Sequence, residues 1–316
     1  MINLDRFSFE DEFKHKTLPM DHPYMWGQTI NQPVYEQDLQ WRLKIQPFTK
    51  GGFEAKAVLV NRNALNRLVN ANRERGLRSK PKERDEADIQ RDREKAAFRA
   101  ARKVRHFAIE IRADRLLTLT SRGLLTDYDQ VIATWKRFMR VLEAADAKFD
   151  YIAVPELHKS GEHYHIHAAI NGFVKADLLR RCWQIALGGK GNERGSDALG
   201  NVDIKQQKRR VTDPIKQCVS IARYISKYIT KSYLEHHKFN RKRYWVPRSI
   251  KLPESSGEWM RAETIAQAVQ ELYSRFDTGI MVEAVKGNSL YITDRNTAMI
   301  FFRYLPKEND DLPLPF

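Results

Sequence analysis

Cysteine is nearly absent from this chain, which has only Cys182 and Cys218 among its 316 residues. A disulfide framework needs more cysteines than this, and neither residue belongs to a zinc-finger spacing. Long apolar runs are missing as well, because no stretch approaches the ~20 apolar residues of a membrane-spanning helix. Acidic residues follow Met1–Asp5, where a signal peptide would have its apolar core. We therefore expect a soluble cytoplasmic protein with no membrane partner.

Acidic residues are outnumbered by basic ones, with 40 Asp and Glu against 55 Lys and Arg, for a net charge of +15. Residues 204–251 hold fourteen of the basic residues against only two acidic ones, Asp213 and Glu235. Charge concentrated in this way indicates a phosphate-binding surface and a nucleic-acid partner. The candidate DNA-contacting residues are Lys205, Lys208, Arg209, Arg210, Arg223, Arg241, Lys242 and Arg243.

Histidines alternate with other residues in the stretch His163-Tyr164-His165-Ile166-His167. On a β-strand successive side chains point to opposite faces, so the three imidazoles share one face and the residues between them share the other. The pattern therefore predicts a strand with one face in the core and a cluster of candidate metal ligands on the other. His158 belongs to the preceding turn, and we treat it as incidental.

Two tyrosines and two lysines occur together in the predicted helix 215–234. At the helical period of 3.6 residues, Tyr224, Tyr228, Lys227 and Lys231 share one arc, and the apolar residues occupy the adjacent one. If these tyrosines were only core residues, the lysines would not share their arc. A tyrosine phenol is a poor nucleophile at neutral pH, and nearby lysines favour the phenolate while neutralising a phosphodiester.

Imidazole-bound metal and a tyrosine nucleophile make a chemically consistent pair. A divalent ion can polarise a non-bridging phosphate oxygen and orient the ester for attack. The product would be a phosphotyrosine ester that stores the energy of the broken DNA bond, so the strand could be rejoined without ATP. The pattern thus favours DNA strand transfer, with two tyrosines available for alternating attack.

Periodicity predicts alternating strands and helices along the rest of the chain, which favours an α+β or α/β fold. The expected strands are 107–111, 116–120, 151–155, 163–170, 202–204, 279–285 and 288–293. The expected helices are 82–105, which is charged and solvated, 128–146, 175–187, 215–234 and 259–276. Residues 1 to about 60 show scattered aromatics and prolines and are predicted to be irregular.

Three motifs together resemble those of HUH rolling-circle replication initiators (Rep endonucleases). His165-Ile166-His167 is similar to their histidine–hydrophobe–histidine motif, and Tyr224 to Lys231 is similar to the two-tyrosine helix of phage and plasmid initiators. The apolar strand Leu116 to Thr120 resembles their first motif. The resemblance covers about residues 105–250. It implies a metal-dependent nuclease that nicks single-stranded origin DNA, with Mg²⁺ or Mn²⁺, a 5′-phosphotyrosyl intermediate and a free 3′-hydroxyl.

The resemblance also implies roles for individual residues. The catalytic residues would be Tyr224 and Tyr228 as nucleophiles with Lys227 and Lys231 beside them, and the metal ligands would come from His163, His165, His167 and Glu156. His165 and His167 are the preferred pair, with His163 as the alternative member. Glu156 would share the histidine face if residues 158–161 form a four-residue loop, which would place it opposite His163. The encoding element would be a phage or plasmid in a bacterial host cell.

On the same grounds the expected fold is α+β, with a central antiparallel sheet of about five strands and flanking helices. The expected domains are an irregular and helical N-terminal region, 1–100, an HUH endonuclease domain, 101–253, and a small αβ unit, 254–316. No Gly-Lys-[Ser/Thr] follows the glycine-rich segment Gly188–Gly200, so ATPase activity is not expected, and unwinding would fall to a host helicase.

Three other functions remain possible from the residues alone. His163–His167 also resembles the signature of histidine-triad nucleotide hydrolases, which need no metal and would leave the tyrosine helix unexplained. HUH relaxases and transposases share the same chemistry. A non-enzymatic nucleic-acid binder would use the histidines only as surface or zinc-site residues.

Overall fold

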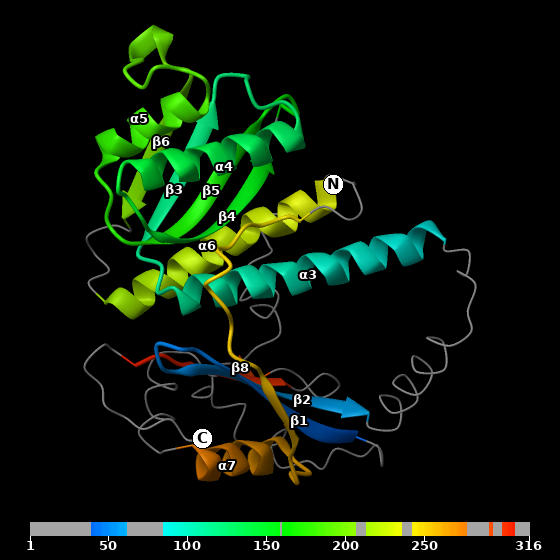
Figure 1. Ribbon diagram of the computed structural model, residues 1–316. Coiled ribbons are helices and arrows are strands. Elements are labelled where there is room, and N and C mark those ends of the chain that lie inside the picture. The colour runs from blue at the N-terminus through cyan, green and yellow to red at the C-terminus, as the bar shows by residue number, and fades with distance from the viewer. Residues whose placement is uncertain are drawn as a thin grey trace. The chain divides into compact units, whose positions relative to one another are not determined.

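The computed structural model describes residues 39–61, 85–158, 160–206, 213–235, 242–276, 291–292 and 299–306 (Figure 1). Of these, residues 85–252 form one compact unit, and residues 39–61 and 253–306 form a second. The sequence analysis places boundaries near residues 100 and 253 instead. The difference arises because strands from the two ends of the chain pair with each other in the second unit.

The first unit is built on an antiparallel sheet whose strand order is β4-β5-β3-β6. The strands are β3 (Arg115–Ser121), β4 (Asp150–Leu157), β5 (Tyr164–Asn171) and β6 (Gly200–Gln206). Each neighbouring pair is antiparallel. Trp245 adds a single antiparallel bridge to Ala153 on β4. Each of these four strands contains one that the sequence pattern predicts.

Two amphipathic helices cover one face of this sheet, namely α4 (Tyr128–Ala144) and α5 (Ala176–Ala186) (Figure 1). Alternate strand residues point into this layer because side chains on a strand alternate between faces. The buried cluster comprises, among others, Leu117, Leu119, Ile166, Ala168 and Val202 from the strands, with Val131, Trp135, Phe138, Leu142, Leu179 and Trp183 from the helices. Both helices lie where the sequence predicts them.

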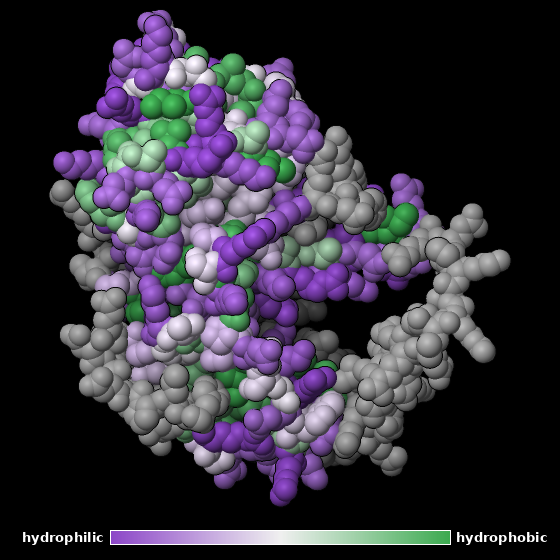
Figure 2. All heavy atoms as spheres, in the orientation of Figure 1, coloured by the Kyte–Doolittle hydropathy of each residue, from purple (hydrophilic) through white to green (hydrophobic). Residues whose placement is uncertain are grey.

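Helix α6 (Pro214–Glu235) contacts the other face of the sheet at β4 and β5, and α3 (Glu86–Glu110) packs along α6. Helix α3 corrects one prediction, because Phe107–Ile111 is not a strand: residues 107–110 form the last turn of α3, and Ile111 caps it. Its apolar positions recur at helical spacing, and Val104, Ala108 and Ile109 are buried. Without that strand, the sheet has four strands among the described residues, not about five. The visible surface of α3 is mainly hydrophilic, as its charged sequence indicates (Figure 2).

The second unit is a five-stranded antiparallel sheet, ordered β7-β1-β2-β9-β8, with one helix packed on it. Its elements are β1 (Leu39–Pro47), β2 (Phe53–Asn61), β7 (Ser256–Trp259), α7 (Ile265–Arg275), β8 (Tyr291–Ile292) and β9 (Met299–Tyr304). Leu272 and Phe276 pack against Trp41, Phe53 and Phe302 from the sheet.

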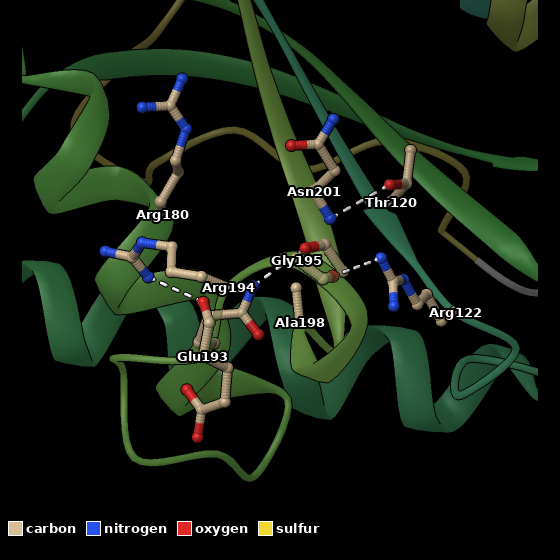
Figure 3. Close-up of a pocket in the computed structure, with 10 residues that line it drawn as sticks. Thr120, Arg122, Arg180, Glu193, Arg194, Gly195, Ala198 and Asn201 are labelled. Atoms are coloured by element: carbon tan, nitrogen blue, oxygen red, sulfur yellow. Dashed lines mark hydrogen bonds between the residues drawn. The ribbon is translucent and has the colours of Figure 1, made fainter.

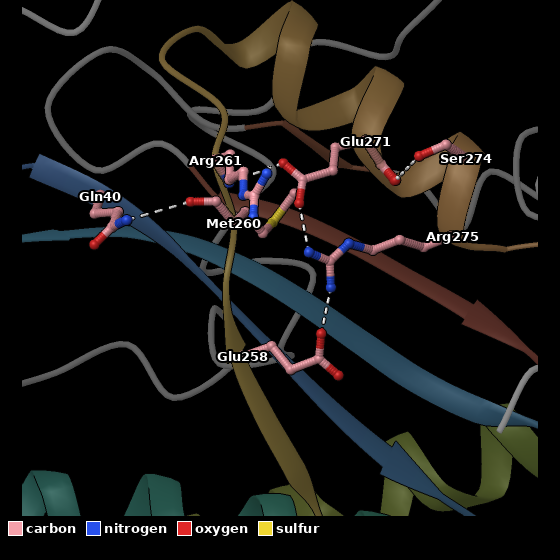
Figure 4. Close-up of polar contacts among 7 residues, drawn as sticks. All are labelled: Gln40, Glu258, Met260, Arg261, Glu271, Ser274 and Arg275. Atoms are coloured by element: carbon pink, nitrogen blue, oxygen red, sulfur yellow. Dashed lines mark hydrogen bonds and ion pairs between the residues drawn. The ribbon is translucent and has the colours of Figure 1, made fainter.

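The expectation of an irregular N-terminal region is wrong for residues 39–61. Trp41, Leu43 and Ile45 alternate with polar residues and are buried on one face, which is the pattern of a half-buried strand. Polar contacts join α7 to the neighbouring strand, since Arg275 pairs with both Glu258 and Glu271 (Figure 4). Of the predicted C-terminal strands, only Tyr291–Ile292 lies within the described residues.

The fold is therefore α+β, with two antiparallel sheets in the described parts of the chain. Within those same parts, no helix combines the length and apolarity needed to span a lipid bilayer.

Candidate active site

The histidine face of β5 is the face that α6 contacts, opposite the core layer of α4 and α5. His165 lies across from Glu156 on β4, and His167 lies across from Thr118 on β3. The predicted pairing of Glu156 with His163 is wrong, because the hairpin closes between His158 and His163, where the backbone N–H of His158 donates to the carbonyl of His163 at 2.8 Å. Glu156 still shares the histidine face, since moving to the next-but-one partner preserves the alternation.

His167 has partners at both ring nitrogens. Its Nε2 lies 2.8 Å from the Glu156 carboxylate, and its Nδ1 lies 3.2 Å from the Thr118 hydroxyl. The residue is only 6% exposed. A carboxylate on one nitrogen and a hydroxyl on the other fix the orientation of the imidazole ring.

The other two strand histidines form a cluster with a residue that the sequence analysis treats as incidental. One ring nitrogen from each of His158, His163 and His165 lies within 4.8 Å of the others. The rings of His158 and His163 stack with centroids 4.6 Å apart. The hairpin register explains the cluster, because it places His158 directly opposite His163. The structure therefore groups His165 with His158 and His163, whereas Glu156 contacts His167.

His165 is in a state suited to metal binding. Desolvation by burial, reinforced by the three neighbouring histidines and partly opposed by Glu156, lowers its pKa from 6.5 to about 4. Its imidazole is therefore neutral at neutral pH and keeps a lone pair for a metal. The cluster of three ring nitrogens fits a transition-metal ion better than Mg²⁺, which prefers oxygen ligands. Glu156 is the oxygen donor on the same face.

The two tyrosines of α6 reach this histidine face. The Tyr228 ring stacks on the His167 ring, with centroids 3.7 Å apart and planes 8° from parallel. Its hydroxyl donates a hydrogen bond of 2.8 Å to the Tyr224 hydroxyl. Desolvation by burial, with a further contribution from the contact with Tyr224, raises the pKa of Tyr228. Tyr224 is 46% exposed, so the two phenols differ in access to solvent.

A lysine from the sheet lies on the Tyr224 side of the site. Lys205 pairs with Asp203 at 2.9 Å on β6, and that hydrogen bond, with a smaller contribution from Tyr224, raises its pKa. Lys205 is one of the predicted DNA-contacting residues. Lys227 is exposed on α6, whereas the side chain of Lys231 lies outside the described residues.

The remaining predicted DNA-contacting residues are only partly described. Arg223 is half-buried on α6, and Lys242 and Arg243 precede Trp245 of the β4 bridge. The Lys242 carbonyl accepts a hydrogen bond from the Tyr128 hydroxyl of α4. Lys208, Arg209, Arg210 and Arg241 lie outside the described residues.

Sequence reasoning missed His158 and Thr118 as members of the site. A histidine that precedes a turn before a histidine-rich strand is a usable signal, because a hairpin can place it opposite the first strand histidine. The Thr118 contact depends on the order of the strands in the sheet, which the sequence does not show.

Residues 114–233 match a family model described as replication-associated protein ORF2. The match covers less than half of the chain, and it contains the histidine strand, Glu156 and both tyrosines. No curated protein and no solved structure matches the chain significantly. The family match supports a replication initiator that binds DNA, is consistent with an endonuclease, and does not favour the alternative functions.

Proposed function

We propose that this protein is a two-tyrosine HUH initiator of rolling-circle replication that nicks single-stranded origin DNA by tyrosine transesterification. The observation that carries the proposal is the contact chain from His167 through the stacked Tyr228 to Tyr224. It joins the histidine face of β5 to the phenols of α6, which are more than fifty residues away in sequence. The family match over this same span supports replication as the process.

Tyr224 is the better placed of the two phenols to attack first. It is half exposed, so a DNA strand can reach its hydroxyl, whereas Tyr228 is held against His167. Tyr228 donates its proton toward the Tyr224 oxygen, and such a bond stabilises a phenolate at Tyr224. The positive charge of Lys205 lies on the same side and favours both the phenolate and a bound phosphate.

The metal would be held by nitrogens of His158, His163 and His165, with Glu156 and His167 as the adjoining donor pair. Mn²⁺ suits this mixed nitrogen and oxygen set better than Mg²⁺ does. When bound, the ion would supply Lewis-acid stabilisation of the charge that develops on the phosphate oxygens. The chain's own contribution is to orient His167 through Thr118 and Glu156 and to present Tyr224.

In the reaction, the Tyr224 oxygen forms a bond to phosphorus as the bond from phosphorus to the DNA 3′-oxygen breaks. The phenol proton passes to water, and the leaving 3′-oxygen takes a proton from water. The products are a 5′-phosphotyrosyl ester and a free 3′-hydroxyl. Reversal of the same step rejoins strands, and the second tyrosine allows a second transfer within one round. A host helicase and the host replication machinery would supply unwinding and synthesis.

The test is formation of an SDS-resistant adduct between the purified full-length protein and origin-containing single-stranded DNA in the presence of Mn²⁺. We expect the adduct with the wild-type chain and with Tyr273→Phe, a control on α7. We expect none with Tyr224→Phe/Tyr228→Phe, and none in EDTA. An adduct in the double variant would show that the mechanism is wrong, and an acid-labile adduct would indicate a phosphohistidine in place of the acid-stable phosphotyrosine.

A further inference from the structure

A basic pocket lies at one end of the first unit's sheet, away from the histidine cluster. It has a volume of about 380 Å³ and is lined from β3, α5, β6 and the glycine-rich segment 188–200 (Figure 3). We define the arginine pocket by its cations Arg122, Arg180 and Arg194, together with Thr120 and Asn201. A volume of this size is within the range of sites that hold small molecules or a nucleotide.

Charge in the arginine pocket is mainly positive. Glu193 is the acidic residue in its lining, but its carboxylate accepts hydrogen bonds from the backbone N–H groups of Lys190 and Gly191. These bonds turn the carboxylate into its own loop and lower its pKa, and Figure 3 shows it pointing away from the guanidinium groups of Arg180 and Arg194. The lining therefore presents three guanidinium groups with one carboxylate directed elsewhere.

The three arginines differ in how firmly they are held. Arg122 donates to the carbonyls of Gly195 and Ser196 at 2.7 and 2.5 Å, so it shapes the loop that walls the pocket. Arg180 pairs with the exposed Asp177, and Arg194 donates to the neighbouring Glu193 carbonyl. Arg180 and Arg194 are thus the two cations that can turn toward a ligand without dismantling the wall.

Strand β6 connects the arginine pocket to Tyr224. Lys205, Asp203 and Asn201 alternate along β6 and therefore share one face of this strand. Lys205 interacts with Tyr224, and Asn201 lines the pocket. The four residues from Lys205 to Asn201 span about 13 Å at the usual rise of a strand. Thr120, across from Asn201, lies two residues along β3 from Thr118, the partner of His167.

We propose that the arginine pocket binds backbone phosphates of the DNA strand, a few nucleotides from the bond that Tyr224 attacks, with the strand lying along β6. Guanidinium groups bind phosphate through paired N–H donors, which makes arginine well suited to this task. The pocket would fix the position of the strand and so the bond presented to Tyr224. This inference rests on the proposed function.

The experiment measures binding of fluorescent oligothymidylate of about 16 nucleotides, at the upper end of the usual site sizes, by anisotropy at several salt concentrations. We expect Arg180→Ala/Arg194→Ala to bind about tenfold more weakly and to lower the slope of log affinity against log salt by about 1.4, or 0.7 for each lost phosphate contact. Arg180→Lys/Arg194→Lys keeps the charges and should retain the slope. The matched control, Arg137→Ala/Arg140→Ala on the exposed side of α4, removes two arginines elsewhere and should match the wild-type protein in slope.

Two outcomes would overturn the proposal. One is that the double alanine variant, with an unchanged melting temperature, binds like the control variant. The other is that dTTP competes as strongly as the oligonucleotide, which would make the pocket a site for free nucleotides. The covalent-adduct assay separates this proposal from the proposed function: if wild-type protein forms no adduct the proposed function fails, whereas an adduct with unchanged salt dependence in the variant removes only the pocket.

Discussion

Replacing Tyr228 by phenylalanine separates two roles that its side chain combines. The phenylalanine ring keeps the stack on His167, whereas the hydroxyl that donates to Tyr224 is lost. A hydrogen bond to a charged group contributes roughly 1.5–3 kcal/mol. Tyr224 is half exposed, so water can replace part of this bond. We therefore expect a loss of about 1–1.5 kcal/mol of transition-state stabilisation, which corresponds to a roughly five- to tenfold slower adduct formation.

The assay is single-turnover formation of the SDS-resistant adduct with saturating DNA and Mn²⁺, followed by peptide mapping of the attachment site. Tyr228→Phe should form the adduct slowly, at Tyr224, and Tyr224→Phe should reduce it much further. Tyr228→Leu, which also removes the ring stack, should be slower than Tyr228→Phe because an aromatic pair contributes roughly 0.5–1.5 kcal/mol beyond its burial. The reasoning is refuted if Tyr228→Phe abolishes the adduct while Tyr224→Phe retains it, since Tyr228 would then be the first nucleophile.

Three further results are expected. His158→Ala should weaken Mn²⁺ binding at least about tenfold by calorimetry, and an unchanged affinity would remove His158 from the ligand set. Gly200→Ala drives a Cβ into the Thr120 carbonyl oxygen and should lower the free energy of unfolding by about 3 kcal/mol in urea, whereas Gly257→Ala, whose nearest neighbour is 3.7 Å away, should be nearly neutral. Because the pKa of His165 falls from 6.5 to about 4 on folding, the folded state binds fewer protons between these values; the metal-free protein should lose stability as pH falls through this range, and His165→Asn should lose less.

The local pattern is sufficient for most elements of the first unit. Strands β3, β4 and β5 and helices α4, α5 and α6 lie close to their predicted ranges, because each has a strong period of two or of 3.6 residues. Phe107–Ile111 was mispredicted because five apolar and polar residues in partial alternation fit either period. Its burial against α6, which a local window does not contain, makes this segment helical.

The second unit shows the opposite case. Strands β1 and β2 are separated from β9 by more than two hundred residues, yet β2 and β9 pair over Phe53–Val58. Nothing local in the sequence indicates this pairing, so domain boundaries based on composition follow the chain and not the sheet. The alternation Trp41-Arg42-Leu43-Lys44-Ile45 was a usable strand signal.

For the site, the sequence alone determined the chemistry available, because it set three histidines on one strand face and two tyrosines on one helix arc. The tertiary structure decided how those groups are shared. The hairpin register placed His158 with His163 and His165, and the packing of α6 stacked Tyr228 on His167 and left Tyr224 exposed. Periodicity fixes which residues share a face, whereas contacts between distant segments depend on register and packing, which no local pattern records.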